Sequence, residues 1–114
     1  MKERYFSMRI KTVTDENIVF DNGNVISFDH EQDCCEYNYA DFSILNPCVI
    51  NYDYDFDEKL DFVAVDELGF KFGSNGHWIF IPCYSEQNGW YTSEINIYYN
   101  GKKVLNFDAQ FIDC

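Results

Sequence analysis

The chain has 114 residues, the usual length of one folded domain, and two separate cores would leave each half marginally stable. Hydrophobic residues make up 46% of it and aromatic residues 19%, a composition that excludes an intrinsically disordered chain. The formal net charge of -12 gives a surface that repels phosphates, which argues against direct binding to nucleic acid or to an anionic membrane. We therefore treat residues 1–114 as a single domain.

The N-terminal part of the sequence predicts a β-meander. Two β-type runs, at residues 17–20 and 25–28, flank the dipeptide Asn22-Gly23. Asn-Gly between such runs is the strongest short hairpin signal, because a type I′ turn needs a positive φ at both central residues. We expect an antiparallel hairpin here.

The next segment indicates a short helix at residues 37–45, because Tyr39, Phe42 and Leu45 fall on one helical face. Asn46-Pro47 would end this helix.

Residues 51–57 then alternate strictly between aromatic and acidic side chains. Asp53, Asp55 and Asp57 would form one wholly acidic face of a strand, which is typical of an exposed edge strand. The same three residues open like a calcium loop, but Glu58 and Ala64 stand where such a loop needs glycine and a bidentate glutamate.

The C-terminal half predicts further strands at residues 60–65, 69–72, 77–81, 94–99 and 102–107. A turn at residues 73–76, a longer loop at 82–92 and a second Asn-Gly turn at Asn100-Gly101 connect them, and residues 108–114 stay unassigned. The expected fold is mainly β or α+β: an antiparallel sheet of about six to eight strands with one or two short helices.

The cysteines indicate free thiols. The sequence contains five, an odd number, and neither a signal peptide nor a stretch long enough to span a membrane accompanies them. His30-Glu31-Gln32-Asp33-Cys34-Cys35-Glu36 holds three types of zinc ligand, but adjacent cysteines point in different directions and no Cys-x-x-Cys spacing occurs. A carboxylate beside a thiol raises its pKa, which disfavours a cysteine nucleophile. We expect no metal, no cofactor, no catalytic residue and a cytoplasmic location.

The stretch at residues 78–93 is the best candidate for a ligand site. It joins the aromatic side chains of Trp78, Trp90 and Tyr91 to the amides of Gln87 and Asn88. Purine sites combine stacking on aromatic rings with hydrogen bonds from amides. Gly89 would allow close approach of the backbone to a ligand. The alternative is a hairpin loop whose aromatic side chains cap the core.

Two motifs carry a resemblance to a known family. The residues His30 to Glu36 with Tyr39-Ala40-Asp41-Phe42, and Phe80-Ile81-Pro82-Cys83-Tyr84 with Gln87-Asn88-Gly89-Trp90-Tyr91, resemble a small family of phages and bacterial mobile elements. This family is similar to the Thoeris anti-defence proteins, which sequester cyclic ADP-ribose-type immune signals without cleaving them.

The resemblance implies a counter-defence binding protein of a phage, acting in the host cytoplasm, with Trp78 as a stacking ring and Asn88 as a polar contact to a small cyclic nucleotide. The strongly acidic sequence departs from this expectation and favours an alternative. An acidic mimic of nucleic acid would bind a basic host defence protein, such as a CRISPR effector, through Asp53, Asp55 and Asp57. A structural or assembly protein is the third reading, and a homo-oligomer is compatible with each.

Overall fold

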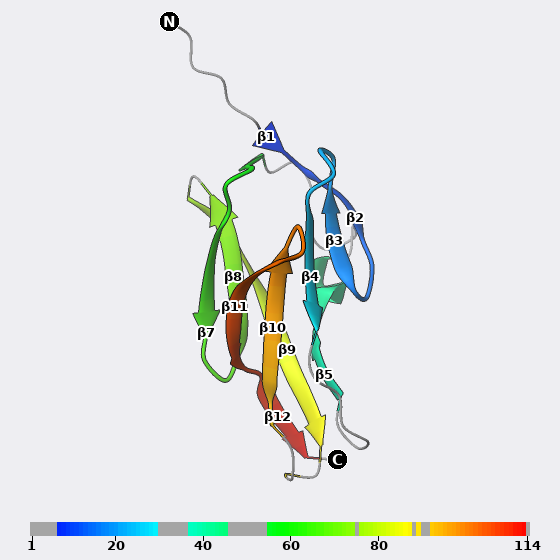
Figure 1. The fold of residues 1–114 in the computed structure, drawn as a ribbon, viewed down its shortest axis with the longest axis vertical. Helices are drawn as coiled ribbons and strands as arrows, with labels where there is room; N and C mark the ends of the chain where they lie inside the picture. The colour runs from blue at the N-terminus through cyan, green and yellow to red at the C-terminus, as the bar shows by residue number, and fades with distance from the viewer. Residues whose placement is uncertain are drawn as a thin grey trace, which may run out of the picture.

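A computed structural model describes residues 7–29, 37–45, 55–74, 76–87, 89 and 92–113 (Figure 1). The described strands in chain order are β1 (Ser7–Met8), β2 (Ile10–Val13), β3 (Asn17–Phe20), β4 (Val25–Asp29), β5 (Tyr37–Ala40), β6 (Phe56–Asp57), β7 (Asp61–Val65), β8 (Gly69–Ser74), β9 (His77–Gln87), β10 (Glu94–Tyr99), β11 (Lys102–Asp108) and β12 (Gln110–Asp113). A short 3-10 helix, η1, spans Phe42–Leu45. The predicted β-rich class is confirmed.

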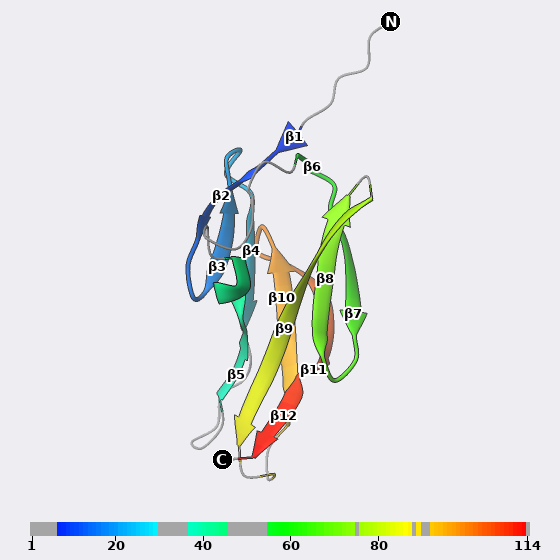
Figure 2. The same cartoon turned by 180° about the vertical axis from the view of Figure 1, so that it is seen from behind.

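The strands form two larger sheets and one short ribbon. The first sheet has the order β11-β10-β4-β3-β2, and the second has the order β12-β9-β8-β7 with β5 also paired to β9. β1 and β6 form the ribbon. Figures 1 and 2 show β10 and β11 on one side of the molecule and β9 on the other, so the two sheets face each other as layers.

The core lies between these layers and follows from the alternation of side chains along each strand. Every second residue of β9 from Ile79 to Gln87 is buried. Three phenylalanines join the layers, because the Phe20 ring lies 6.0 Å from that of Phe56 and 6.4 Å from that of Phe72, both edge to face. Of the predicted aromatic face at residues 51–57, the structure describes Phe56, which is 1% exposed and belongs to the core.

Both Asn-Gly dipeptides close antiparallel hairpins, as predicted. At Asn100-Gly101 both residues have a positive φ, 54° and 82°, which is the type I′ geometry. At Asn22-Gly23 the predicted type I′ turn is wrong, since only Gly23 has a positive φ (93°). The loop there holds four residues, and the Asn22 side-chain carbonyl accepts a hydrogen bond from the Asn24 N–H at 3.0 Å.

Other details of the predicted fold need correction. Residues 37–45 form a strand and a 3-10 helix instead of one short helix, because β5 pairs with β9 and its buried residues alternate. The loop predicted at 82–92 begins only after Gln87, because β9 continues to that residue and pairs there with β5 and β12. Pro82 is tolerated inside β9 because it lies at the end of the ladder to β8, and its carbonyl accepts the Asp41 N–H.

The tail forms β12, which pairs with β9 in parallel. This pairing is an exception to the expected antiparallel sheet. The Ala109 N–H, just before β12, donates to the Ser93 carbonyl, which fixes the tail next to the start of β10.

Candidate functional site

Trp78 lies near the start of β9, on the outward face of the second sheet. Its indole is 44% exposed and stands opposite Gly73 of β8 in the strand register. A Cβ at Gly73 would come within 1.9 Å of the His77 carbonyl oxygen, so the strands approach closely here. The Lys71 ammonium lies 5.1 Å from the centre of the Trp78 ring, within the range of a cation–π contact.

Gln87 lies at the other end of β9 and points into the molecule. Its side chain is fully buried and donates to the Ser85 hydroxyl at 2.7 Å and to the Thr92 carbonyl at 3.2 Å. Asn38 of β5 completes this buried polar network, donating to the carbonyls of Thr92 at 3.1 Å and Glu94 at 2.9 Å. The network holds the two ends of the 88–91 connection together, so the amide of Gln87 supports the fold.

The structure does not bring Trp78 and Gln87 together. They are separated by most of the length of β9, and at about 3.3 Å per residue this places them roughly 30 Å apart (Figure 2). Gly89 is exposed, with φ at 96°. Asn88, Trp90 and Tyr91 lie outside the described residues. Trp78 and Gln87 therefore cannot line one ligand pocket, although each end of residues 78–93 stays a candidate ligand site by itself.

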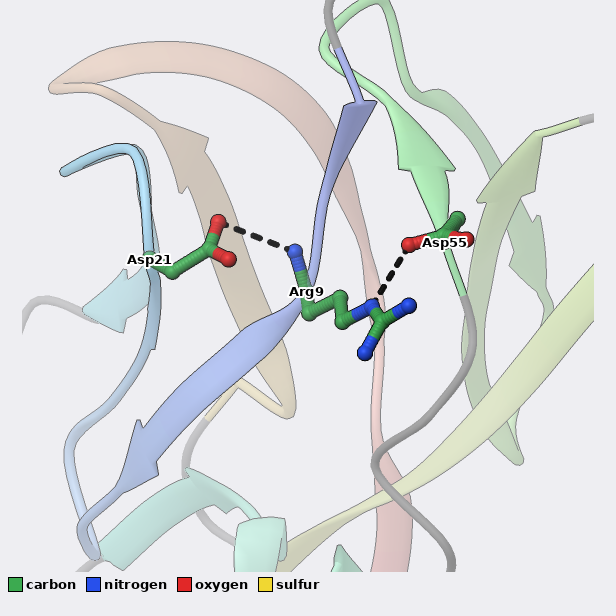
Figure 3. Close-up of polar contacts among 3 residues, drawn as sticks. All are labelled: Arg9, Asp21 and Asp55. Carbon is green, nitrogen blue, oxygen red and sulfur yellow. Dashed lines mark hydrogen bonds and ion pairs between the residues drawn. The ribbon is translucent and has the colours of Figure 1, made fainter.

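The predicted acidic face is only partly described, because Asp53 lies outside the described residues. Asp55 is exposed and forms an ion pair with Arg9, whose Nε lies 2.6 Å from Oδ1 of Asp55 (Figure 3). The hydrogen bond from Arg9 holds the pKa of Asp55 below its ordinary value. Arg9 also donates its backbone N–H to Asp21 at 3.1 Å, which ties this segment to the first hairpin.

Asp57 has a local structural role. Its Oδ1 accepts the Lys59 N–H at 2.9 Å, and its own N–H donates to the Ser74 hydroxyl at 2.7 Å. Asp55 and Asp57 thus keep acidic charge at this end of the molecule, but both already have protein partners.

Cys83 is buried in the core and is a free thiol. Burial, and secondly the charge of Asp41, raise the pKa of this thiol, so it is a poor nucleophile at neutral pH. The other four cysteines and His30 lie outside the described residues. Within the described part of the chain, no group of three or more histidine, cysteine or acidic side chains is placed to hold a metal ion.

The sequence reasoning missed the outward face of the second sheet. The register places Val63 of β7, Lys71 of β8 and Phe80 of β9 in one row, next to Trp78. Val63 and Phe80 are each 41% exposed, which is unusual for such apolar side chains in neighbouring positions. The predicted strand at 77–81 already put Trp78 and Phe80 on one face, but only the register with β7 and β8 brings Val63 and Lys71 next to them.

One exposed carboxylate borders this row of side chains. Asp61 is exposed and pairs in register with Gly73, the residue opposite Trp78. We name Val63, Lys71, Trp78 and Phe80, together with Asp61, the outer face.

Comparisons of the chain with protein-family models, curated proteins and solved structures found no match. Among the described residues, no helix is long and apolar enough to cross a membrane. Function must therefore be inferred from the geometry of the molecule.

Proposed function

We propose that this protein works by binding, and that it uses the outer face to dock on a basic partner protein. The observation that carries the proposal is the combination of half-exposed Trp78, Phe80 and Val63 on one face of the second sheet. Monomeric proteins rarely expose neighbouring apolar groups of this size without an interaction to cover them. Tryptophan and other aromatic residues are also the side chains most enriched at the centres of protein interfaces.

Charge indicates the kind of partner. The chain carries a net charge of -12, and the exposed Asp61 lies beside the apolar row. The overall charge of a protein steers partners of the opposite sign toward it and disfavours partners of the same sign. A second copy of this chain would bring two strongly acidic surfaces together, so a basic protein is favoured.

The resemblance to phage counter-defence proteins indicates which class of basic protein the partner belongs to. A basic, nucleic-acid-binding protein of host defence, such as a CRISPR effector, fits both the charge and the apolar row. The protein would then inhibit by occupying the partner's groove. Regular phosphate mimicry by Asp53, Asp55 and Asp57 is a smaller part of this proposal, since Asp55 is paired with Arg9 and Asp57 caps Lys59.

Site-specific photo-cross-linking tests this proposal. A photoreactive phenylalanine at position 80 is compared with the same group at Thr12, an exposed position on β2 of the other sheet. We expect position 80 to capture one basic protein in the natural host, and position 12 to capture none. Equal capture at both positions, or an acidic protein at position 80, would contradict the proposal.

Sequestration of a cyclic nucleotide is the second candidate, and the Lys71–Trp78 pair supports it. A base can stack on an exposed indole, a contact worth about 1–3 kcal/mol, while an ammonium group 5.1 Å away meets a phosphate. Calorimetry with cyclic ADP-ribose isomers and cyclic dinucleotides tests it. Binding that is lost in both Trp78→Ala and Lys71→Gln would support it, and absence of binding to the wild-type protein would remove it for these ligands.

A further inference from the structure

A cluster of tyrosines lies on the outward side of the second sheet, at the end of β9 away from Trp78. Tyr37 of β5 pairs in register with Glu86 of β9, and Tyr39 pairs with Tyr84. Antiparallel partners and residues two apart on a strand share a face, so these four side chains form a compact block on the outer side of the sheet. We name this block the tyrosine cluster.

The rings of the cluster contact one another, Tyr37 and Tyr39 by stacking and Tyr39 and Tyr84 at a tilt of 44°. The Tyr37 and Tyr39 rings lie 4.7 Å apart with 23° between their planes, and the Tyr84 ring lies 5.6 Å from that of Tyr39. Stacking on its neighbours fixes the orientation of each ring before any ligand arrives. Tyr37 is nevertheless 51% exposed, a large fraction for an aromatic ring in ordered contact.

A carboxylate is held in place beside these rings. The Tyr39 hydroxyl donates to Oε2 of Glu86 at 2.8 Å. Burial, followed by the hydrogen bond and the charge of Glu86, raises the pKa of Tyr39 to about 12, so this hydroxyl stays a donor at every physiological pH. A carboxylate has two oxygens and can accept further hydrogen bonds beside the one from Tyr39.

We propose that the tyrosine cluster binds a guanidinium group, namely an arginine side chain of the basic partner. The electron-rich faces of tyrosine rings attract cations, and arginine stacks on aromatic rings more readily than lysine does. A carboxylate at the edge of the rings accepts the N–H groups of the same guanidinium. The net charge of -12 favours a cationic occupant over a neutral one, such as a sugar or a proline-rich peptide.

This inference rests on the proposed function for the identity of the partner, but the cluster can be tested without it. The probe is n-butylguanidinium, and the neutral probe n-butylurea has a similar planar head without the charge. Tyrosine rings labelled with ¹³C report binding residue by residue in NMR spectra. We expect saturable shifts at Tyr37 and Tyr39 with butylguanidinium, with a dissociation constant on the order of 10 mM, and no saturable shifts with butylurea.

Three variants and one control separate the roles within the cluster. Glu86→Gln and Tyr37→Leu should each weaken binding of the probe at least about fivefold, because they remove the carboxylate and the exposed ring. Tyr39→Phe keeps the ring but releases Glu86, so an intermediate loss is expected. Tyr98→Leu is the matched control, since Tyr98 also bonds a carboxylate, Asp29, but lies on the other sheet.

The outcomes separate this inference from the proposed function. Equal shifts with butylurea, or unchanged affinity in both Glu86→Gln and Tyr37→Leu, would overturn the guanidinium site. If position 80 captures a basic partner while Tyr37→Leu and Glu86→Gln bind that partner like the wild type, the outer face stands and the cluster has no part in it. Saturable binding of the probe without any captured partner would keep the cation site and remove the proposed function.

Discussion

Replacement of Asn38 by leucine tests the buried polar network that joins β5 to β9 and β10. Asn38 is fully buried, and its side chain donates to the carbonyls of Thr92 and Glu94 and accepts a hydrogen bond from the Ser85 hydroxyl. Leucine has a similar volume, so the substitution removes three hydrogen bonds while leaving the packing nearly unchanged.

The magnitude follows from the partners that are left behind. Three net hydrogen bonds contribute about 3 kcal/mol, at about 1 kcal/mol each. The Thr92 carbonyl keeps the Gln87 amide as a donor. The buried Ser85 hydroxyl loses Oδ1 of Asn38 as its acceptor, and the Glu94 carbonyl loses the Asn38 amide, which adds about 1–3 kcal/mol for each of these groups that stays buried. We expect a loss of at least about 4 kcal/mol in the free energy of unfolding, a large share of the 5–15 kcal/mol typical of a domain.

Urea unfolding followed by intrinsic fluorescence measures this loss. The midpoint should fall by more than about 1 M, since ordinary slopes lie at about 1–3 kcal/mol per M. The control is Asn106→Ala on β11, an exposed asparagine that should change stability by less than about 0.5 kcal/mol. If Asn38→Leu were no more destabilising than Asn106→Ala, the account of this network would be wrong.

Four further predictions concern separate parts of the molecule. Titration followed through ¹³C-labelled tyrosine rings should show Tyr39 ionising near pH 12, and Glu86→Gln should lower that pKa by removing the hydrogen bond and the charge that act on Tyr39; an unchanged titration of Tyr39 would contradict the assignment. Since the folded pKa lies above the unfolded one, the Tyr39 contribution to stability is present below pH 10 and is lost as the pH rises toward 12. The contribution of Asp55 to stability depends on pH in the opposite direction, because the pKa of Asp55 is lowered in the folded state. This contribution is present above the unfolded pKa of about 3.8 and is lost as the pH falls below it. Asp55→Asn should therefore reduce the loss of stability at acid pH. Gly101→Ala should lower the free energy of unfolding by about 1 kcal/mol because of the positive φ, since nothing lies within 4 Å of a Cβ there. Gly73→Ala should prevent folding or lower it by more than about 3 kcal/mol, because the new Cβ meets the His77 carbonyl. Equal thermal stability of the two variants would refute this. Cys83 should react with a thiol reagent only after unfolding, and rapid modification of Cys83 in the native protein, located by mass spectrometry, would contradict its buried position.

The sequence predicted those parts of the fold that depend on neighbouring residues. The two Asn-Gly hairpins and most strand positions follow from local alternation and turn chemistry. Residues 37–45 were misassigned because three apolar residues fit a helical face, whereas pairing with β9 decides the actual structure. The parallel pairing of β12 depends on a contact between residues about 26 positions apart, which no local pattern indicates.

The candidate sites were harder to predict, for the same reason. Trp78 and Gln87 are close in sequence but lie at opposite ends of one long strand, because a strand rises about 3.3 Å per residue. The tyrosine cluster, by contrast, joins Tyr37 to Glu86 across 49 positions of sequence through the β5–β9 register. Side chains that share a face of a sheet can be recognised only once the pairing is known.

Hydroxyl-radical footprinting tests the central claim, that the outer face docks on a partner, most directly. The free protein and its complex with the captured partner are oxidised under the same conditions, and each aromatic side chain is quantified by mass spectrometry. Trp78 and Phe80, now 44% and 41% exposed, should be oxidised several times more slowly in the complex, while Tyr98 on the other sheet keeps its rate. Unchanged oxidation of Trp78 and Phe80, with protection of Tyr98 instead, would place the partner on the opposite sheet and contradict the account.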